Sequence, residues 1–363
     1  MTTLDLSGAT RAARRLTRQP ETNNYTKLSR QIRDLGLLRR TPTFYSLLFA
    51  GLMLALGGAI AGFVLLGHSW LQLLIAGALG IIFTQFAFLS HEAAHRQIFT
   101  SGPANDLAGR LLGNGLVGLS YSWWMNKHSR HHANPNRIGK DPDIEESAIS
   151  FYSEEAVTRT GWRSLVATKQ GYFFFPLLLL EGLNLHYASV RSLVTVRPTK
   201  HRLFEIGLLV GRFGLYLAAV FWVLPLGMAF AFVGVQVAIF GLYMGSSFAP
   251  NHKGMPIVPS GVKLDFLTRQ VRTSRNISGR LWPTVLMGGL NYQVEHHLFP
   301  SMPRPHLAAA RRLVRDHCSL HGIAYTEVSL ISSYRTVITY LNEVGLSARD
   351  PFACPVAARL GRD

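Results

Sequence analysis

Two long stretches of this chain contain no charged side chain, and they constrain its fold more than any other feature. Residues 41–90 hold no Asp, Glu, Lys or Arg over 50 positions, and residues 213–252 hold none over 40. A helix of a water-soluble protein turns one face to solvent and does not stay uncharged over such a length. The sequence therefore predicts an integral membrane protein and excludes an ordinary soluble globular protein, a disordered chain and a disulfide scaffold.

Each uncharged stretch is long enough for two membrane-spanning helices, because one span needs about 20 apolar residues. A turn at Gly67-His68-Ser69 would divide the first stretch, and a turn at Pro225 would divide the second. Both turns are short and uncharged, so each pair of helices forms a tight hairpin. We predict four spans, near residues 43–66, 69–90, 205–225 and 227–248.

Two other apolar segments are less regular. Glycines interrupt residues 107–119, and Glu181 and His186 interrupt residues 172–190. The pattern fits interfacial helices beside the entry site of a greasy substrate. It fits equally well helices that pack against the cytoplasmic ends of the spans, and the sequence leaves both interpretations open.

Lys and Arg collect outside the predicted hairpin turns. Residues 1–40 hold nine of them, and segments 91–204 and 253–363 hold most of the others. By the positive-inside rule, we predict a multi-pass protein of the cell membrane whose termini and middle segment are cytoplasmic. We expect a mobile basic cytoplasmic N-terminal arm (1–40), one main domain (41–345) and a C-terminal tail (346–363).

The formal net charge of +17 indicates contact with anionic lipid, and an anionic substrate head group is a second candidate partner. Because the charges flank membrane spans, we expect no nucleic acid partner. The two cysteines, Cys318 and Cys354, are too few to hold an iron–sulfur cluster.

Eight of the 14 histidines are expected near the cytoplasmic membrane surface, most in groups whose members are three or four residues apart and so share one helix face. With a glutamine that repeats this spacing, the candidate metal ligands are His91, His95, His128, His131, His132, His252, Gln293, His296 and His297. This set is too large for one tetrahedral zinc and suits two metals with open positions for a reactant. Nitrogen-rich sites of that kind fit iron and O2 activation.

The first histidine group also admits a different reaction class. His91-Glu92-Ala93-Ala94-His95 matches H-E-x-x-H, in which two histidines bind zinc and the glutamate is the general base of a protease. An intramembrane zinc protease is therefore an alternative, although it leaves the other groups unexplained. We expect the remaining six histidines to be ordinary surface or hydrogen-bonded residues: His68, His186, His201, His306, His317 and His321.

The order of these groups resembles the three histidine boxes of the membrane-bound fatty acid desaturases. The boxes read HEAAH at 91–95, HSRHH at 128–132 and QVEHH at 293–297, and Trp123-Trp124 precedes the second. The segment FAPNHKG at 248–254 is similar to actinobacterial acyl-CoA and acyl-lipid desaturases. The resemblance extends over most of the chain outside the N-terminal arm and the last residues.

The resemblance implies an all-α membrane protein with four transmembrane helices in two hairpins and a cytoplasmic helical cap that holds a di-metal site. It implies two iron ions (Fe2+/Fe3+) held by the eight histidines, with Gln293 at the position of a ninth ligand, and no catalytic residue beyond the metal centre. The substrate would be an acyl-CoA or a membrane lipid, with O2 as oxidant. Because no His-Pro-Gly-Gly haem motif is present, electrons would come from an external ferredoxin or reductase. A membrane di-iron hydroxylase would share these ligands and remains an alternative.

Charged residues near the boxes give two further expectations. We expect four carboxylates to orient imidazoles, or else to be solvated surface groups: Glu92, Asp141, Asp143 and Glu295. Three arginines could bind a CoA phosphate or a lipid head group, or could equally form a solvated charge run: Arg272, Arg275 and Arg280.

Overall fold

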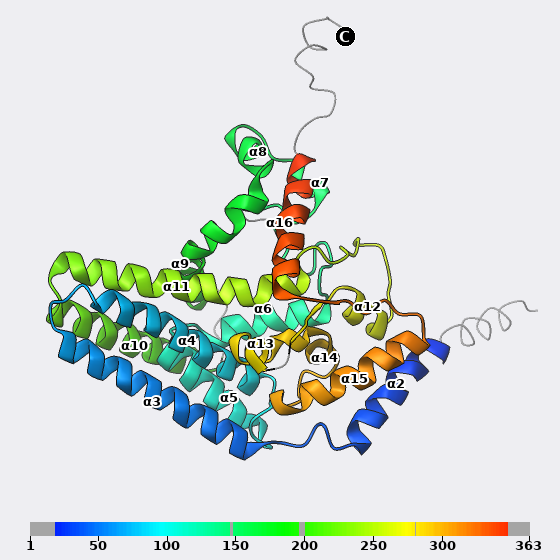
Figure 1. Ribbon diagram of the computed structural model, residues 1–363, viewed down its shortest axis with the longest axis horizontal. Coiled ribbons are helices and arrows are strands. Elements are labelled where there is room, and N and C mark those ends of the chain that lie inside the picture. The colour runs from blue at the N-terminus through cyan, green and yellow to red at the C-terminus, as the bar shows by residue number, and fades with distance from the viewer. Residues whose placement is uncertain (1–18, 146–147, 196–199, 280, 348–363) are drawn as a thin grey trace, which may run out of the picture.

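The computed structural model describes residues 19–145, 148–195, 200–279 and 281–347, and helices dominate these residues (Figure 1). The long helices are α2 (Gln19–Asp34), α3 (Pro42–Leu66), α4 (Gln72–Ala94), α9 (Gln170–Thr195), α10 (Arg202–Val223), α11 (Leu226–His252), α15 (Arg304–Leu320) and α16 (Leu330–Leu346). The shorter helices are α5 (Gly102–Arg110), the π-helix η1 (Leu111–Val117), α6 (Tyr121–Ala133), α7 (Ser153–Ala156), α8 (Trp162–Ala167), α12 (Phe266–Arg272), α13 (Leu281–Leu286), the 3-10 helix η2 (Leu290–Tyr292) and α14 (Gln293–Leu298). Strands β1 (Asn276–Ile277) and β2 (Glu327–Val328) pair in parallel.

Five of the described helices are long and apolar enough to cross a membrane: α3, α4, α9, α10 and α11. Four of them coincide with the predicted spans. The fifth, α9, covers the segment that we predicted to be interfacial or packed against the spans. It has the lowest mean hydropathy of the five, 1.3. It therefore stays a prediction that the chain has four spans. It also stays a prediction that the remaining helices are cytoplasmic.

The two predicted hairpins lie with their turns at the same end of the molecule. The imidazole Nε2 of His68, in the turn between α3 and α4, is 3.0 Å from the carbonyl oxygen of Val223 at the end of α10. The opposite ends of α4 and α11 carry histidines, and the short helices α6 and α14 lie beside those ends (Figure 1). The hairpins thus bring the histidine-bearing ends of α4 and α11 to one region.

Small residues let α9 and α11 approach closely. A Cβ added at Gly182 of α9 would collide with the carbonyl oxygen of Val237, and a Cβ added at Gly241 of α11 would collide with the backbone of Gly182. Backbone contact through glycines is typical of helices packed within membranes. By contrast, α3 and α10 expose large apolar side chains, such as Leu65 and Trp222, at 85% and 90% of their surface. Such exposure suits a lipid environment.

The N-terminal segment differs from the expected mobile arm. Its described part forms α2, which lies beside α15 (Figure 1). Leu28 and Ile32 are fully buried in a cluster that includes Val314 and Cys318 of α15. The basic composition concealed an apolar face, because Leu28 and Ile32 are four residues apart and share one side of the helix. Residues 1–18, Cys354 and all but the start of the C-terminal tail lie outside the described residues.

Candidate metal centre

Four elements bring the predicted ligands together. The end of α4 carries His91 and His95, the end of α11 carries His252, and the other ligands project from α6 and α14. The α6 helix begins where the Ser120 side chain accepts a hydrogen bond from the backbone N–H of Trp123. This N-cap sets the rotation of the helix and therefore the direction in which its three histidines point.

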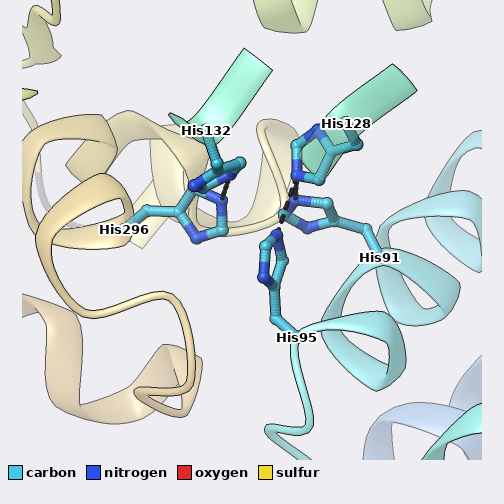
Figure 2. Close-up of side chains that lie close together, drawn as sticks. All are labelled: His91, His95, His128, His132 and His296. Carbon is cyan, nitrogen blue, oxygen red and sulfur yellow. Dashed lines mark hydrogen bonds between the residues drawn. The ribbon is translucent and has the colours of Figure 1, made fainter. Parts of the chain in front are cut away.

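The ring nitrogens form two groups, whose members lie within 4.8 Å of one another. The five-histidine cluster contains His91, His95, His128, His132 and His296. Figure 2 shows these five imidazoles converging from three separate segments of the chain. Its shortest Nε2–Nε2 distances are 2.8 Å for His95 and His128, 3.1 Å for His132 and His296, and 3.2 Å for His91 and His128.

The three-histidine cluster contains His131, His252 and His297. The Nε2 atoms of His131 and His252 lie 3.3 Å apart. Gln293 lies against this cluster, with its amide nitrogen 2.9 Å from Nε2 of His252. All eight predicted histidines thus belong to one cluster or the other.

Helical geometry explains how adjacent histidines serve different clusters. Residues four apart on a helix differ by about 40° around its axis, whereas neighbours differ by about 100°. His128 and His132 therefore face one cluster, while His131 points to the other. The same separation assigns His296 to the five-histidine cluster and His297 to the three-histidine cluster.

These nitrogen positions fit metal ions. Two nitrogens bound to one metal at about 2.1 Å lie about 3.0–3.4 Å apart for bond angles near 90–109°. The observed separations, 2.8–3.3 Å, match that range closely. Nε2 of His297 is buried and has no hydrogen-bond partner among the described atoms. A buried polar atom without a partner is costly, and a metal ion would satisfy it.

Burial favours the neutral form that metal binding requires. It lowers the pKa of four ligands outside the candidate spans well below the usual value: His128, His132, His296 and His297. His131 behaves differently, because the nearby carboxylates of Asp141 and Asp143 outweigh its burial and raise its pKa. A carboxylate beside a ligand imidazole fixes the tautomer and increases the basicity of the metal-binding nitrogen.

The three-histidine cluster has a hydrogen-bond partner behind each ring. Nδ1 of His131 is 3.0 Å from the Asp141 carboxylate, and Nδ1 of His252 is 2.9 Å from the carbonyl oxygen of Thr273. Nδ1 of His297 is 2.9 Å from Oε1 of Gln270. These contacts turn all three Nε2 atoms toward the cluster centre. Asp141 was predicted for this role, whereas Gln270 and Thr273 gave no sequence signal.

Two of the four predicted carboxylate partners do not contact an imidazole. Glu92 instead forms a buried bidentate ion pair with Arg304, with both N–O distances 2.7 Å. Glu295 accepts hydrogen bonds from Asn276 and Tyr325. For both, the direction of the side chain decides the outcome, because each points away from the ligand face of its helix. Asp143 does lie near His131, at 3.3 Å, and also pairs with Lys127 at 2.8 Å.

Two of the three predicted anion-binding arginines, Arg272 and Arg275, lie among the described residues. Arg275 is buried and donates to the backbone carbonyl oxygens of Pro250 and Lys253, so its charge serves the fold. Arg272 is exposed on α12, and Arg280 lies outside the described residues. The six histidines expected to be ordinary residues belong to neither cluster.

Sequence reasoning missed one carboxylate that positions α6. Glu205 of α10 is fully buried and accepts hydrogen bonds from Ser120 and Ser122, at the start of α6, and from Arg110. A charged residue at the start of an apolar helix was the available signal. Through Ser120 and Ser122, Glu205 fixes the beginning of the helix that carries three ligands.

A narrow apolar cavity of ≈ 30 Å³ reaches His91. Its walls come from α4, η1, α6 and α11, and they include Phe88, Val117, Trp124 and Phe248. The Trp124 ring stacks on His128 at a centroid distance of 4.1 Å. A small apolar cavity therefore adjoins the five-histidine cluster at His91.

Comparison with known proteins agrees with this geometry. The fatty acid desaturase family model matches residues 68–329, which contain every predicted ligand. A "Delta(8)-fatty-acid desaturase" of Helianthus annuus is 27% identical, over 90% of this chain and 74% of the relative. An "Acyl-lipid (9-3)-desaturase" of Physcomitrium patens is 29% identical, over 76% of this chain and 54% of the relative. A "Delta 8-(E)-sphingolipid desaturase" of Lachancea kluyveri is 28% identical, over 92% and 62%.

Proposed function

Because this chain belongs to the fatty acid desaturase family, a family of oxidoreductases, we propose that it desaturates a fatty acyl chain in an O2-dependent reaction at two iron ions. The acyl group would arrive on CoA or on a membrane lipid. One observation carries the proposal: two imidazole clusters lie side by side where a narrow apolar cavity ends. The closer likeness to actinobacterial desaturases stays a prediction.

Bound iron would supply the oxidising power that removes hydrogen from an unactivated methylene, which no side chain can do. The protein's own task is to hold and orient. Asp141 keeps the Nδ1–H of His131 directed toward itself, so that Nε2 faces the cluster. The apolar walls formed by Phe88 and Phe248 exclude water from the cavity beside His91. Each methylene of an acyl chain that they bury contributes about 0.8 kcal/mol to its binding.

Gln293 is proposed as an oxygen ligand of the three-histidine cluster. Its amide nitrogen now faces His252 at 2.9 Å, and its amide oxygen accepts a hydrogen bond from Asn251 at 3.1 Å. Rotating the amide by 180° exchanges these two atoms, which are assigned from the hydrogen-bond network. The oxygen would then complete a four-ligand site with the three imidazoles.

We propose that the histidine ends of α4 and α11 face the cytoplasm, where an external ferredoxin or reductase delivers electrons. The proposal is supported by the concentration of Lys and Arg outside the hairpin turns and by the net charge of +17. A basic surface favours the approach of an acidic redox protein.

The structure weighs against the protease alternative. A zinc protease would need Glu92 as a general base near the metal. Both oxygens of Glu92 are instead held by Arg304. A di-iron hydroxylase would use the same ligands, so the product must distinguish it from a desaturase.

The test is to incubate membranes containing the protein with a labelled saturated acyl substrate, reductant and O2. We expect an alkene as the main product and about two iron per chain. The His131→Ala variant should be inactive, and His321→Ala, which changes a histidine outside both clusters, should retain activity. An alcohol as the main product would identify a hydroxylase, and one zinc per chain would indicate hydrolytic chemistry.

A further inference from the structure

A second, larger cavity lies on the other side of α6 from the histidines. It has a volume of ≈ 410 Å³ and is enclosed mainly by α6 and α9. Its walls combine polar and apolar side chains, whereas those of the narrow cavity beside His91 are mainly apolar. The charged side chains that line it are Lys127, Arg130, Glu145, Glu181 and Arg202.

The α9 helix carries an exposed apolar face beside this cavity. Glu181, Asn184, Ala188 and Ser192 line the cavity and follow one another at intervals of three or four, so they form one stripe along the helix. A different face carries exposed apolar side chains: Leu180, Leu183, Tyr187, Val190 and Val194. A membrane lipid could therefore approach the cavity along the apolar face of α9. A soluble ligand would make no favourable contact with that face.

The two cations that α6 contributes to the cavity each pair with a carboxylate. Lys127 pairs with Asp143 at 2.8 Å, and Arg130 pairs with Glu145 at 2.6 Å. Lysine has three donor hydrogens and arginine five, so both retain donors for an incoming anion. Each of these two cations thus has a carboxylate partner and also N–H donors left for an anion.

The Glu181 carboxylate interacts electrostatically with Lys127, but at a longer range than an ion pair. Its carboxylate accepts a hydrogen bond from Asn184 at 3.1 Å, and it takes part in none of the ion pairs between described residues. A half-buried carboxylate without a directly paired cation favours an additional cationic partner. The cavity thus offers donors for an anion and an acceptor for a cation.

We propose that this cavity binds the headgroup of a zwitterionic phospholipid, in which Lys127 and Arg130 contact the phosphate and Glu181 contacts the ammonium group. A polyanionic carrier such as CoA would instead meet the carboxylates of Glu145 and Glu181. The inference rests on the proposed function, since it identifies the acyl carrier for the same reaction: a membrane lipid.

The position of the cavity suits that role. The helix that lines it also carries ligands of both clusters, because Lys127 and Arg130 alternate with His128, His131 and His132 along α6. A headgroup held on one face of α6 would keep the acyl chain of the same lipid close to the metals on the other face.

A charge-reversal variant tests the proposal without relying on turnover. Binding of radiolabelled phosphatidylcholine and phosphatidylglycerol to the purified full-length protein is measured in non-ionic detergent, with no reductant. We expect the unmodified protein to prefer phosphatidylcholine, and Glu181→Gln to lose about tenfold in that affinity, because it removes one charge–charge contact between the carboxylate and the choline ammonium group. Glu181→Lys should reverse the preference toward phosphatidylglycerol, a gain that misfolding cannot produce.

Glu343→Lys is the matched control, because Glu343 is exposed on α16 and lies outside the cavity. It should leave the preference unchanged. Equal binding of the two lipids by the unmodified protein, or an unaltered preference in Glu181→Lys, would overturn the proposal. Selective phosphatidylcholine binding in this assay, together with no alkene in the activity assay that contains reductant and O2, would refute the proposed reaction and leave the headgroup site standing. Desaturation of acyl-CoA alone would refute the headgroup site and leave the reaction.

Discussion

Replacing Asp141 with asparagine should weaken metal binding at the three-histidine cluster alone. Asp141 is fully buried, and its oxygens lie 3.0 and 3.1 Å from Nδ1 of His131. They also accept the backbone N–H groups of Asn136 at 2.7 Å and Asp143 at 3.0 Å. Asparagine keeps one oxygen, so its NH2 group must face a donor that the carboxylate now satisfies.

The size of the effect follows from this geometry. Loss of a hydrogen-bond partner behind a metal-bound histidine typically reduces metal affinity 10- to 100-fold, or about 1.4–2.7 kcal/mol. We expect the upper part of this range, because the substitution also opposes a buried amide N–H. The five-histidine cluster should keep its metal, since no member of it contacts Asp141.

Metal analysis during timed dialysis against a chelator measures the effect. The iron content of Asp141→Asn should fall from about two toward one per chain before the unmodified protein loses any. Asp316→Asn is the matched control, because the side chain of Asp316 is 70% exposed on α15. Loss of both metals together, or no selective loss, would refute the assignment of Asp141 to a single cluster.

Three further predictions concern the scaffold. Arg304→Met should destabilise the protein by about 3–5 kcal/mol, because it leaves Glu92 buried without a cation. Glu92→Gln in the same chain should restore part of the melting temperature, and stability losses that simply add in the double variant would contradict a coupled pair. Gly182→Ala should lower the melting temperature by several degrees, because its methyl group would collide with the carbonyl oxygen of Val237, and an unchanged value would mean that α9 and α11 do not touch there. Cys318 should resist alkylation at pH 8 in a Cys354→Ser background until the protein is unfolded, because burial raises its pKa to about 12, and rapid labelling of the folded protein would be the contrary result.

The structure brings together the eight histidines that the sequence indicated as candidate ligands. Helical spacings of three and four residues pointed to seven of them, and His252 was indicated by its place at the end of a predicted span. The partition into five and three was not predictable, since it depends on how α6 and α14 are rotated relative to α4 and α11. His131 and His132 are neighbours in the chain, yet they face different clusters.

Other features required contacts that a linear pattern does not contain. Glu92 is one turn from the ligand His95 and looked suited to orient an imidazole, but Arg304, more than 200 residues away, binds it. Gln270 and Thr273 become partners of ligand rings only because α12 and its C-cap lie against both α14 and the end of α11. Charge depletion identified three of the four hairpin helices and the second half of α10, whereas the polar stripe on α9 concealed a fifth candidate span.

The assignment of consecutive histidines to different clusters has a mechanical consequence. One peptide unit joins His131 to His132, and another joins His296 to His297, so two short covalent tethers cross from one imidazole group to the other. A trans peptide fixes the separation of successive Cα atoms at 3.80 Å, and it does not stretch. Covalent bonds as well as packing therefore limit the distance between the two histidine clusters. A backbone movement that displaced one cluster would also displace the other.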